Sequence, residues 1–325
     1  MQKNRKVTVV IPNYNGIKYM EECLKSLYAN NTDFETIVID NGSTDGSREL
    51  VENNYPQVRL MKFSENQGFC KAVNVGIEAA ETPFILLLNN DTMSAPGFVE
   101  NMVEAIEKSE KIFSVSSKML SMSQPEYIDD CGDLYCGLGW AFSLGKGKRA
   151  SEYYNREANV FAACGGASIY RKSVFNEIGL FDDNHFAYLE DIDIGYRSKI
   201  YGYKNMFCPK AVVYHAGSGF SGSRYNEFKI RLSARNSIYL IYKNMPLLQI
   251  LINSPLLIIG IFIKWLFFFK KGFGALYIKN IIIGLKFCTT QEARKHKVYI
   301  KKEKCINYVT IQIELWWNIL RKIFG

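Results

Sequence analysis

The chain has 325 residues, of which 48% are hydrophobic and 22% are charged. This composition is that of a globular protein with a large core, so disorder is excluded as a general description. Residues 1–240 hold 26 basic and 29 acidic residues, a net charge of −3, whereas residues 241–325 hold 14 basic and 3 acidic residues, a net charge of +11. Ile, Leu, Phe and Trp separate the basic residues of the second region, which favours an anionic lipid surface over nucleic acid as its partner.

The eight cysteines include no C-x-x-C pair, and none lies at a zinc-like spacing from a His. Residues 1–7 pass from charged residues directly into a β-branched run, so no secretory signal is expected. The expected compartment is therefore the reducing cytosol, where free thiols are the default.

Four short apolar runs alternate with helical patterns in the first 90 residues. They cover residues 7–12, 36–40, 58–63 and 84–88. This alternation predicts an α/β fold with a doubly wound, mostly parallel sheet and right-handed crossovers. The loop after the first run, Pro-Asn-Tyr-Asn-Gly, is neither G-x-G-x-x-G nor a P-loop. That difference argues against a dinucleotide dehydrogenase or an NTPase, so a nucleotide's phosphates must be held in another way.

The fourth run ends abruptly in two amides and a carboxylate, Asn89, Asn90 and Asp91. Ligands of open α/β sheets bind at the carboxyl ends of the strands. Oxygen ligands at that edge suit Mg²⁺ or Mn²⁺ bridging to a diphosphate. The alternative is a plain polar turn after the strand, because Asn and Asp are common turn residues.

Asp40 ends the second run and is expected at the same edge of the sheet, as is Asp45 in the turn that follows. A carboxylate at this edge can accept a hydrogen bond from a base N–H or a ribose hydroxyl. The alternative for Asp40 is a structural role in the turn that approaches the next helix.

The second half of the chain is expected to cover the site. Helices are predicted over residues 98–107 and 172–178, and a strand over residues 113–120. The segment 121–160 is rich in Gly, Ser, Tyr and charge. It is predicted to be an irregular excursion over the site.

A further helix is predicted to begin at Glu190 or Asp191, which places these acids and Asp193 in its first turn. The helix macrodipole favours acids there, so capping is the alternative role for all three. His215 follows a predicted strand over residues 211–214 and precedes a Gly-rich loop. A neutral imidazole there can bind a metal or a phosphate, and packing within the loop is the alternative.

Several of these segments match one family in order and in residue type. Residues 9–16, 39–46, 65–69, 88–91 and 188–193 resemble the motifs of glycosyltransferase family 2, and most closely those of its rhamnosyltransferase-like branch. The resemblance covers roughly the first 240 residues. It implies a GT-A fold and inverting transfer of a sugar from a nucleotide-diphosphate donor.

The resemblance also implies roles for single residues. Asp40 would bind the base or ribose, Asp91 the metal ion, and Asp191 would be the general base, with Glu190 as the second catalytic candidate. The other metal-site candidates are Asn89 and His215. The candidate donor-binding residues are Pro12, Tyr14, Asn15, Asp40, Ser43, Asp45, Asn66, Gly68, Lys71 and Asn90. One departure is that Asn89 stands where the family commonly has an acid, so only Asp91 would bring charge to the metal.

The last quarter of the chain is apolar and basic. Residues 246–269 are almost wholly apolar, and the uncharged run 245–263 approaches the ~20 residues that span a bilayer. Lys264, Lys271, Lys279 and Lys286 recur every seven or eight residues, which predicts one face of a helix lying in the membrane interface. Residues 311–324 add paired Trp and terminal basic residues, again typical of an interface. The alternative is a helical appendage that packs on the catalytic domain or on a second subunit.

These features predict a catalytic domain over residues 1–240 and a membrane-associating helical region over residues 241–325. The leading hypothesis is a glycosyltransferase at the cytoplasmic face of the cell membrane that adds a sugar, with rhamnose as one candidate, to a lipid-linked or polysaccharide acceptor of the cell surface. A nucleotidyltransferase and a non-catalytic carbohydrate-binding or scaffold protein are the alternatives. A second copy of the chain, in a homodimer, is a further candidate partner. No nucleic-acid partner is expected.

Overall fold

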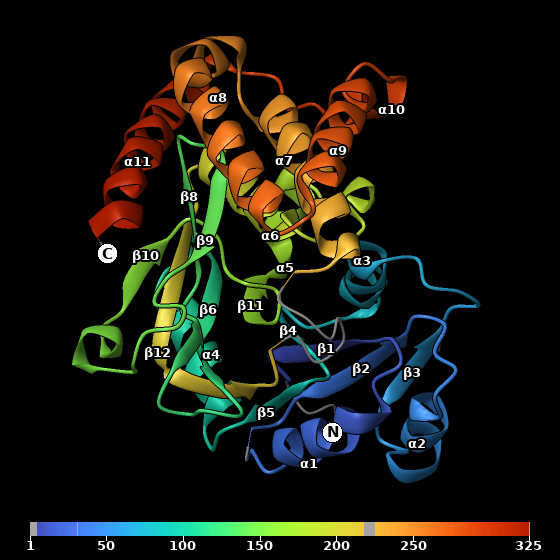
Figure 1. The fold of residues 1–325 in the computed structure, drawn as a ribbon. Helices are drawn as coiled ribbons and strands as arrows, with labels where there is room; N and C mark the ends of the chain where they lie inside the picture. Colours follow the sequence, from blue (N-terminus) through green and yellow to red (C-terminus); the bar gives the residue numbers. More distant parts are fainter. Residues whose placement is uncertain (1–4, 31, 218–224, 325) are drawn as a thin grey trace.

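A computed structural model describes residues 5–30, 32–217 and 225–324. Its main sheet runs through the centre of the molecule (Figure 1). Eight strands follow one another across it, with β5 (Thr92–Ser94) added beside β12 and β7 (Ile128–Asp130) beside β6. In spatial order these eight are β10 (Ala158–Val160), β12 (Lys204–His215), β6 (Ile112–Ser121), β11 (Ala167–Arg171), β4 (Phe84–Leu88), β1 (Val7–Asn13), β2 (Glu35–Asp40) and β3 (Arg59–Lys62).

The strands from the first 90 residues form the parallel half of the sheet, as the sequence predicts. In this half β1 pairs in parallel with both β2 and β4, so that Val10 lies between Ile37 and Leu87. Strand β11 is antiparallel to both β4 and β6, and it joins this half to the parallel pair β6 and β12. Because β1, β2 and β4 are parallel, their carboxyl ends meet at one edge of the sheet.

Helices cover both faces of the sheet, which makes it doubly wound. Alternate residues of a strand point to opposite faces, so Val9 packs with one set of helices and Val10 with the other. The first set is α1 (Ile17–Tyr28), α2 (Ser47–Asn54) and α4 (Phe98–Glu107); the second is α3 (Phe69–Ala79), α5 (Lys172–Ile178) and α6 (Glu190–Ile200). Gly76 allows α3 to approach β1, because a Cβ there would lie 2.3 Å from Cγ1 of Val10.

The prediction that residues 121–160 are irregular is wrong. This segment contains β7, a two-stranded hairpin of β8 (Asp133–Cys136) and β9 (Trp140–Ser143), the 3₁₀ turn η1 (Glu152–Asn155) and β10. Two more strands differ from the sequence prediction: β11 was not expected, and β12 starts at Lys204 rather than at residue 211. Strands β11 and β12 pair with strands far away in the chain, and a strand that depends on distant partners has a weak local pattern.

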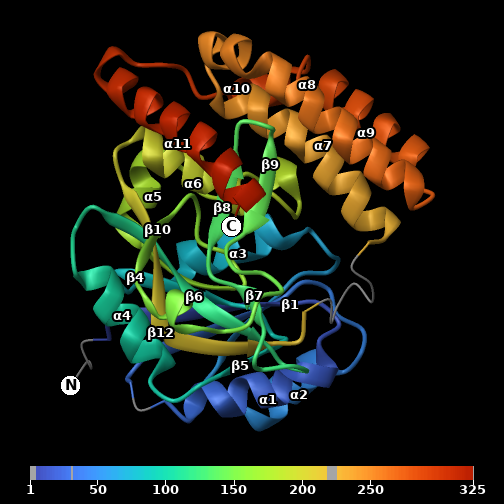
Figure 2. The same ribbon diagram turned by 60° about the vertical axis from the view of Figure 1, so that its left-hand side comes forward.

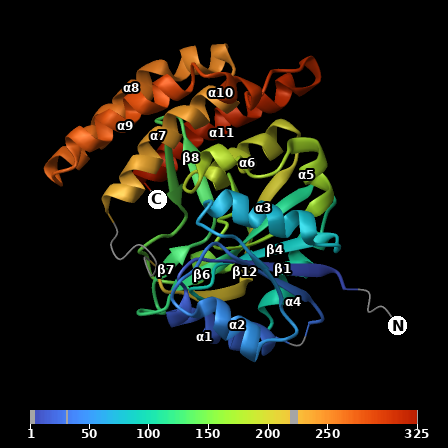
Figure 3. The same ribbon diagram turned by 90° about the vertical axis from the view of Figure 1, so that its right-hand side faces the viewer.

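The C-terminal part is a group of helices that lies at the end of the molecule opposite α1 and α2 (Figures 1, 2 and 3). It consists of α7 (Glu227–Asn244), α8 (Leu247–Lys270), α9 (Gly274–Phe287), α10 (Gln291–Lys295), the 3₁₀ turn η3 (Lys302–Lys304) and α11 (Cys305–Phe324). Helix α7 runs through residue 240, the predicted domain boundary, and packs against both α6 and α9.

The expectation of one helix with four lysines along one face is wrong. Lys264 lies in α8 and Lys271 in the turn that ends it, whereas Lys279 and Lys286 lie in α9. Gly272 makes this turn, with a φ of +81° that favours glycine. Helices α8 and α9 then lie side by side (Figure 3).

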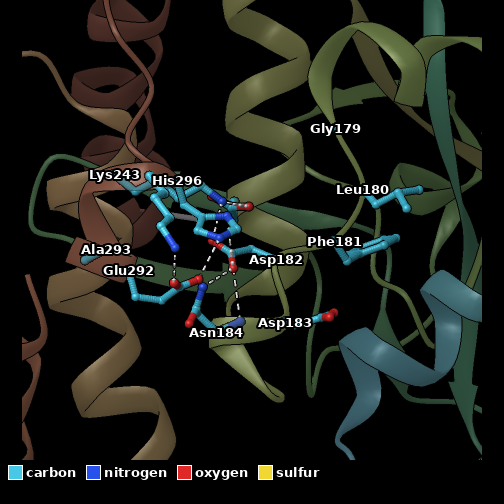
Figure 4. A network of polar contacts seen from close by, with 12 residues as sticks. Gly179, Leu180, Phe181, Asp182, Asp183, Asn184, Lys243, Glu292, Ala293 and His296 are labelled. Atoms are coloured by element: carbon cyan, nitrogen blue, oxygen red, sulfur yellow. Dashed lines mark hydrogen bonds and ion pairs between the residues drawn. The ribbon is translucent and has the colours of Figure 1, made fainter. Parts of the chain in front are cut away.

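A buried charge network joins the C-terminal helices to the rest of the protein (Figure 4). The Lys243 ammonium of α7 lies 2.7 Å from a carboxylate oxygen of Asp182 and 2.9 Å from one of Asp193. His296, at the end of α10, lies 3.6 Å from the other carboxylate oxygen of Asp182. Arg197 pairs with Asp193 within α6 at 2.7 Å. Burial alone would raise the pKa of Asp193, but Arg197 and Lys243 hold it well below its usual range.

We expect Lys243→Met to lower the free energy of unfolding by about 3–5 kcal/mol, because it leaves two buried carboxylates short of a partner. Chemical denaturation of the full chain measures the change. The control is Lys111→Met at an exposed lysine, which should change stability by less than about 0.5 kcal/mol. Equal stability of the two variants would mean that the network contributes nothing.

Candidate active site

One large cavity of about 560 Å³ opens at the carboxyl edge of the parallel strands. It lies where a doubly wound sheet is expected to bind its ligand, and its volume is within the range of small-molecule sites. Ten of the residues predicted from the sequence line it: Pro12, Tyr14, Asn66, Gly68, Asn89, Asn90, Asp91, Glu190, Asp191 and His215. These residues are far apart in the sequence, and the fold brings them together.

The other five predicted residues are not among those that line the cavity. The Asp40 carboxylate is fully buried and accepts hydrogen bonds from the Asn13 amide at 3.0 Å and the Ser43 backbone N–H at 3.2 Å. Asp45 accepts from the Ile17 backbone N–H at 2.8 Å. In this arrangement both carboxylates hold the loops after β1 and β2, and their donor-binding roles stay predictions.

Ser43, Asn15 and Lys71 also have partners within the protein. The Ser43 hydroxyl accepts from the Asn15 backbone N–H at 2.9 Å, and the Asn15 side chain in turn accepts from the Thr44 backbone N–H at 2.9 Å. Lys71 is exposed beside Asp183, at 3.7 Å. These three roles likewise stay predictions.

Asn13 is an organising residue that the sequence analysis did not single out. Its amide nitrogen lies within 3.1 Å of oxygen atoms on Asp40, Ser43 and Ser47, and its oxygen accepts from the Asn90 amide at 2.7 Å. Asn13 therefore ties the loops after β1, β2 and β4 to one another. Its place directly after Pro12, at the end of a buried strand, was the signal that could have identified it.

Asp91 and His215 form the metal-site candidate, and a third residue, Asp129, completes it. Strand β12 pairs with β5, which directly follows Asp91, and this pairing brings the two side chains together. Nε2 of His215 lies 3.2 Å from Oδ1 of Asp91, and its Nδ1 lies 2.7 Å from Oδ2 of Asp129. Burial opposes the charged imidazolium, but the hydrogen bonds with Asp129 and Asp91 raise the pKa of His215 to about 9.

This arrangement fits a divalent cation. A carboxylate and an imidazole that converge in the cavity are ligands suited to Mn²⁺ or Mg²⁺, and Asn89 lies next to them in the lining. Asp129 holds Nδ1 of His215, as partners of metal-binding histidines usually do, so Nε2 is the nitrogen that faces Asp91. Such a cation would replace the proton that His215 now shares with Asp91.

Glu190 and Asp191 begin α6, as predicted, and both line the cavity. The backbone before them is strained, because Tyr188 and Leu189 have φ values of 68° and 69°. Leu189, at the N-cap position, offers no side-chain cap, and Glu190 and Asp191 lie in the first turn, where the helix macrodipole favours acids, so the role in the helix start stays the alternative for both. Asp193 points instead into the buried network with Lys243.

The two acids differ in their surroundings. Oδ1 of Asp191 accepts from the Gly165 backbone N–H at 3.0 Å, whereas Oε2 of Glu190 is buried without a hydrogen-bond partner. Burial raises the pKa of Glu190 to about 7, helped by the nearby charge of Asp133. Burial and the charge of Glu190 also raise the pKa of Asp191 well above its usual range. Carboxylates with raised pKa values are suited to proton transfer near neutral pH.

The segment 121–160 contributes a group of acids to the cavity that the sequence analysis missed. Asp129, Asp130 and Asp133 line it, together with Lys146, which pairs with Asp129 at 2.8 Å. Asp130, Asp133 and Cys164 lie close enough to share a metal ion, but burial raises the pKa of all three. Asp91 and His215 lie at the carboxyl edge of the parallel strands, where a diphosphate is expected to bind, so they remain the predicted pair. The run of three acids within five residues was the available signal.

Comparison with known proteins agrees with this geometry. The family model described as glycosyl transferase family 2 matches residues 8–179. The N-acetylglucosaminyl-diphospho-decaprenol L-rhamnosyltransferase of Mycobacterium tuberculosis is 25% identical over 233 residues, which cover 64% of this chain and 75% of that protein. The glycosyltransferase GlyG of Streptococcus pneumoniae serotype 4 is also 25% identical, over 55% of this chain and 61% of its own length.

Two solved structures share the fold. A mannosyltransferase of Pyrobaculum calidifontis, in complex with GDP-Man and Mn²⁺, has a TM-score of 0.55 at 15% identity and covers 97% of this chain and 86% of its own. GalNAc-T7 with UDP, GalNAc and Mn²⁺ has a TM-score of 0.59 at 17% identity. The match covers 74% of this chain and 48% of the GalNAc-T7 chain. These likenesses confirm the predicted GT-A fold. The family model matches more than half of the 325 residues of this chain, so the chain belongs to glycosyl transferase family 2.

Proposed function

We propose that this glycosyltransferase is an inverting enzyme that uses a nucleotide-diphosphate sugar as donor and a divalent cation as cofactor. The observation that carries the proposal is that one cavity contains both Asp91 with His215 and the acids Glu190 and Asp191. The first pair is suited to the leaving diphosphate, and the second pair to the acceptor hydroxyl group. Sugar transfer needs both at once.

The chain's residues divide the reaction between them. Asp191 takes the proton from the acceptor hydroxyl as its oxygen attacks the anomeric carbon. Because Asp191 acts as a base and not as a nucleophile, the displacement is direct and inverts the anomeric centre. Asp91 and His215 would hold Mg²⁺ or Mn²⁺, which supplies charge neutralisation for the departing diphosphate. The Gly165 N–H bond orients the Asp191 carboxylate. The mannosyltransferase and GalNAc-T7 structures, which contain Mn²⁺, support this choice of cation.

For the acceptor we propose a lipid-linked glycan of the cell surface, and for the sugar we propose rhamnose as the first candidate. Both follow the activity of the mycobacterial relative, whose name specifies rhamnosyl transfer to a decaprenol-linked sugar. An acceptor of this kind resides in the membrane, so we further propose that the protein works at the cytoplasmic face, attached through its C-terminal region. The net charge of +11 in residues 241–325, against −3 in residues 1–240, supports this placement, because the cytoplasmic surface of a membrane is anionic.

A panel of nucleotide sugars tests the proposal. Purified full-length protein is incubated with rhamnose, glucose, galactose, mannose and N-acetylglucosamine donors carrying thymine, uracil or guanine, and release of the nucleoside diphosphate is measured with Mn²⁺ and with excess EDTA. We expect one donor to be turned over faster than the others, and only with the cation present. No turnover of any donor, together with no binding of a nucleoside diphosphate by calorimetry, would contradict the assignment.

A further inference from the structure

Three C-terminal helices carry an apolar surface that is not covered in the described part of the chain. We call this surface, formed by the outward sides of α8, α9 and α11, the apolar face. Its α8 part includes Ile258 and Phe262, which are 67% and 53% exposed, and its α11 part includes Trp317, which is 58% exposed. Single exposed apolar residues are normal, but many of them gathered on neighbouring helices mark an interaction site.

We propose that the apolar face lies flat on an anionic bilayer and that α8, although long enough to cross a membrane, lies in the plane of the interface instead. The contact with the bilayer does not depend on the proposed function. Only its purpose, access to a lipid-linked acceptor, rests on that function. By composition, α8 is the one helix of the described residues that is long and apolar enough to span. Its packing decides between the two orientations.

The inward side of α8 is hydrogen-bonded at three successive levels, two of them to the catalytic part of the protein and the middle one to α11. Gln249 accepts from the Tyr196 hydroxyl at 2.5 Å, and Asn253 exchanges hydrogen bonds with Gln312 of α11 at 2.8 and 2.9 Å. Further along, the Gly260 carbonyl accepts from the indole N–H of Trp140 in β9 at 3.0 Å. The first and last of these α8 residues, Gln249 and Gly260, are eleven positions apart, which is ~16 Å of helix.

A spanning orientation would carry these partners into the hydrocarbon or break their bonds. Tyr196 belongs to α6 and Trp140 to the hairpin beside the cavity, so both are fixed to the catalytic part. Buried polar side chains such as Gln249 and Asn253 would lose their partners if α8 were stripped from the protein. In-plane contact keeps every one of these bonds and still covers the outward side of the helix.

The charges around the apolar face fit anionic lipid. Residues 247–287 contain no Asp or Glu, and α8, α9, α11 and the turn after α8 carry five exposed lysines without an ion pair that the structure shows. They are Lys270, Lys271, Lys279, Lys286 and Lys322. The exposed indole of Trp317 is a side chain that prefers the interface. A second copy of the chain would bring five further lysines against these five, so repulsion disfavours it as the occupant.

One end of the apolar face lies near the cavity. Tyr225, just before α7, packs against Phe267 and Phe268 of α8 with ring centroids 5.3 and 6.3 Å apart. Three residues later, Phe228 contacts Phe186, and both line the cavity. A bilayer on the apolar face would therefore lie close to the cavity rim, where a lipid-linked acceptor must enter.

Sedimentation with vesicles tests the surface. The full-length chain should bind vesicles of phosphatidylglycerol and phosphatidylethanolamine, and the double variant Ile258→Glu/Phe262→Glu should bind them at least about tenfold more weakly, because it loses two apolar anchors and gains two charges. The matched control is Tyr153→Glu, which introduces an acid at an equally exposed aromatic residue of η1, a turn that contacts β12 and is not part of the apolar face. Circular dichroism melting checks that all three proteins are folded. Equal vesicle binding by the double variant and the native chain overturns the proposal.

Labelling decides the orientation of α8. Leu247→Cys and Lys271→Cys place a thiol at each end of the helix, in a Cys305→Ser background that removes the exposed native thiol. With the protein bound outside sealed vesicles, a membrane-impermeant maleimide should label both positions. Labelling of one position only until detergent is added would show a spanning helix and overturn the in-plane assignment.

Light scattering tests whether a second copy of the chain covers the apolar face. A native chain that is dimeric, becomes monomeric in the double variant and ignores vesicles would show that a second copy covers the face, which overturns the proposal. Vesicle binding is measured without donor or acceptor. Failure of binding therefore leaves the transferase assignment standing, and absence of sugar transfer leaves the binding result standing.

Discussion

Asp191→Asn is expected to lower sugar transfer by roughly 10²–10⁴-fold while donor binding stays close to native, since the amide has the shape of the carboxylate but cannot take a proton. The carboxylate lies in the cavity lining, oriented by the Gly165 backbone N–H at 3.0 Å. Transfer is measured with saturating donor, and donor binding by calorimetry with the nucleoside diphosphate.

Glu190→Gln is the matched control, because it makes the same chemical change one residue earlier. It should cost much less transfer, since successive helix residues point ~100° apart and only one of them can face the acceptor. It should also stabilise the protein near neutral pH. Burial raises the pKa of Glu190 to about 7, so its ionised form opposes folding, and this cost appears as the pH rises above the ordinary value of 4.5.

The pH profile adds a second readout. Transfer should fall as the pH drops below the pKa of Asp191, because a protonated carboxyl group cannot act as a base. The charge of Glu190 raises that pKa, so Glu190→Gln should shift the acid limb of the profile to lower pH. Near-native transfer by Asp191→Asn, together with an inactive Glu190→Gln, would assign the base to Glu190.

Asp91→Ala should reduce metal-dependent donor turnover by roughly 10²–10³-fold, the size of effect seen when one preorganised electrostatic stabiliser is removed. Asp91 is the acid that meets Nε2 of His215 at the sheet edge, at 3.2 Å. Mn²⁺ affinity, followed by calorimetry, should fall in parallel. The fold should persist, because His215 keeps its bond to Asp129.

Glu100→Ala is the control for Asp91→Ala. Glu100 is an exposed acid in the first turn of α4, on a helix that covers the sheet rather than the cavity. Its removal should change neither Mn²⁺ affinity nor turnover. Full activity of Asp91→Ala, or of the native protein in excess EDTA, would remove Asp91 and the cation from the mechanism.

The parallel half of the fold could be predicted because its signals are local. Each strand is a short run of buried β-branched or aliphatic residues, and each following helix repeats apolar residues at helical spacing. Parallel strands place their carboxyl ends at one edge whatever the rest of the chain does. For this reason Asn90, Asp91 and Pro12 were expected near one another, and all of them line the cavity.

Other features depend on pairing across long distances, which a local pattern does not reveal. Asp129 lies in β7, which pairs with β6. Strand β6 in turn pairs with β12, far away in the chain, and this pairing brings Asp129 to His215. Asp40 occupies the predicted strand end, but its carboxylate turns into the protein toward Asn13, a partner 27 residues away. The four lysines have the spacing of one helix face, but a single turn at Gly272 divides them between two helices.

The sequence by itself determined the family, the doubly wound sheet and the acids at its edge, because these follow from periodicity and from motifs within short stretches. The packing of the C-terminal helices, in contrast, became visible in the folded protein alone. Gln249 and Asn253 interrupt an apolar segment of the sequence, and in the fold they form the buried side of α8 and bind α6 and α11. Which side of a helix is buried depends on the partners that fold against it, and those partners lie more than fifty residues away in the chain.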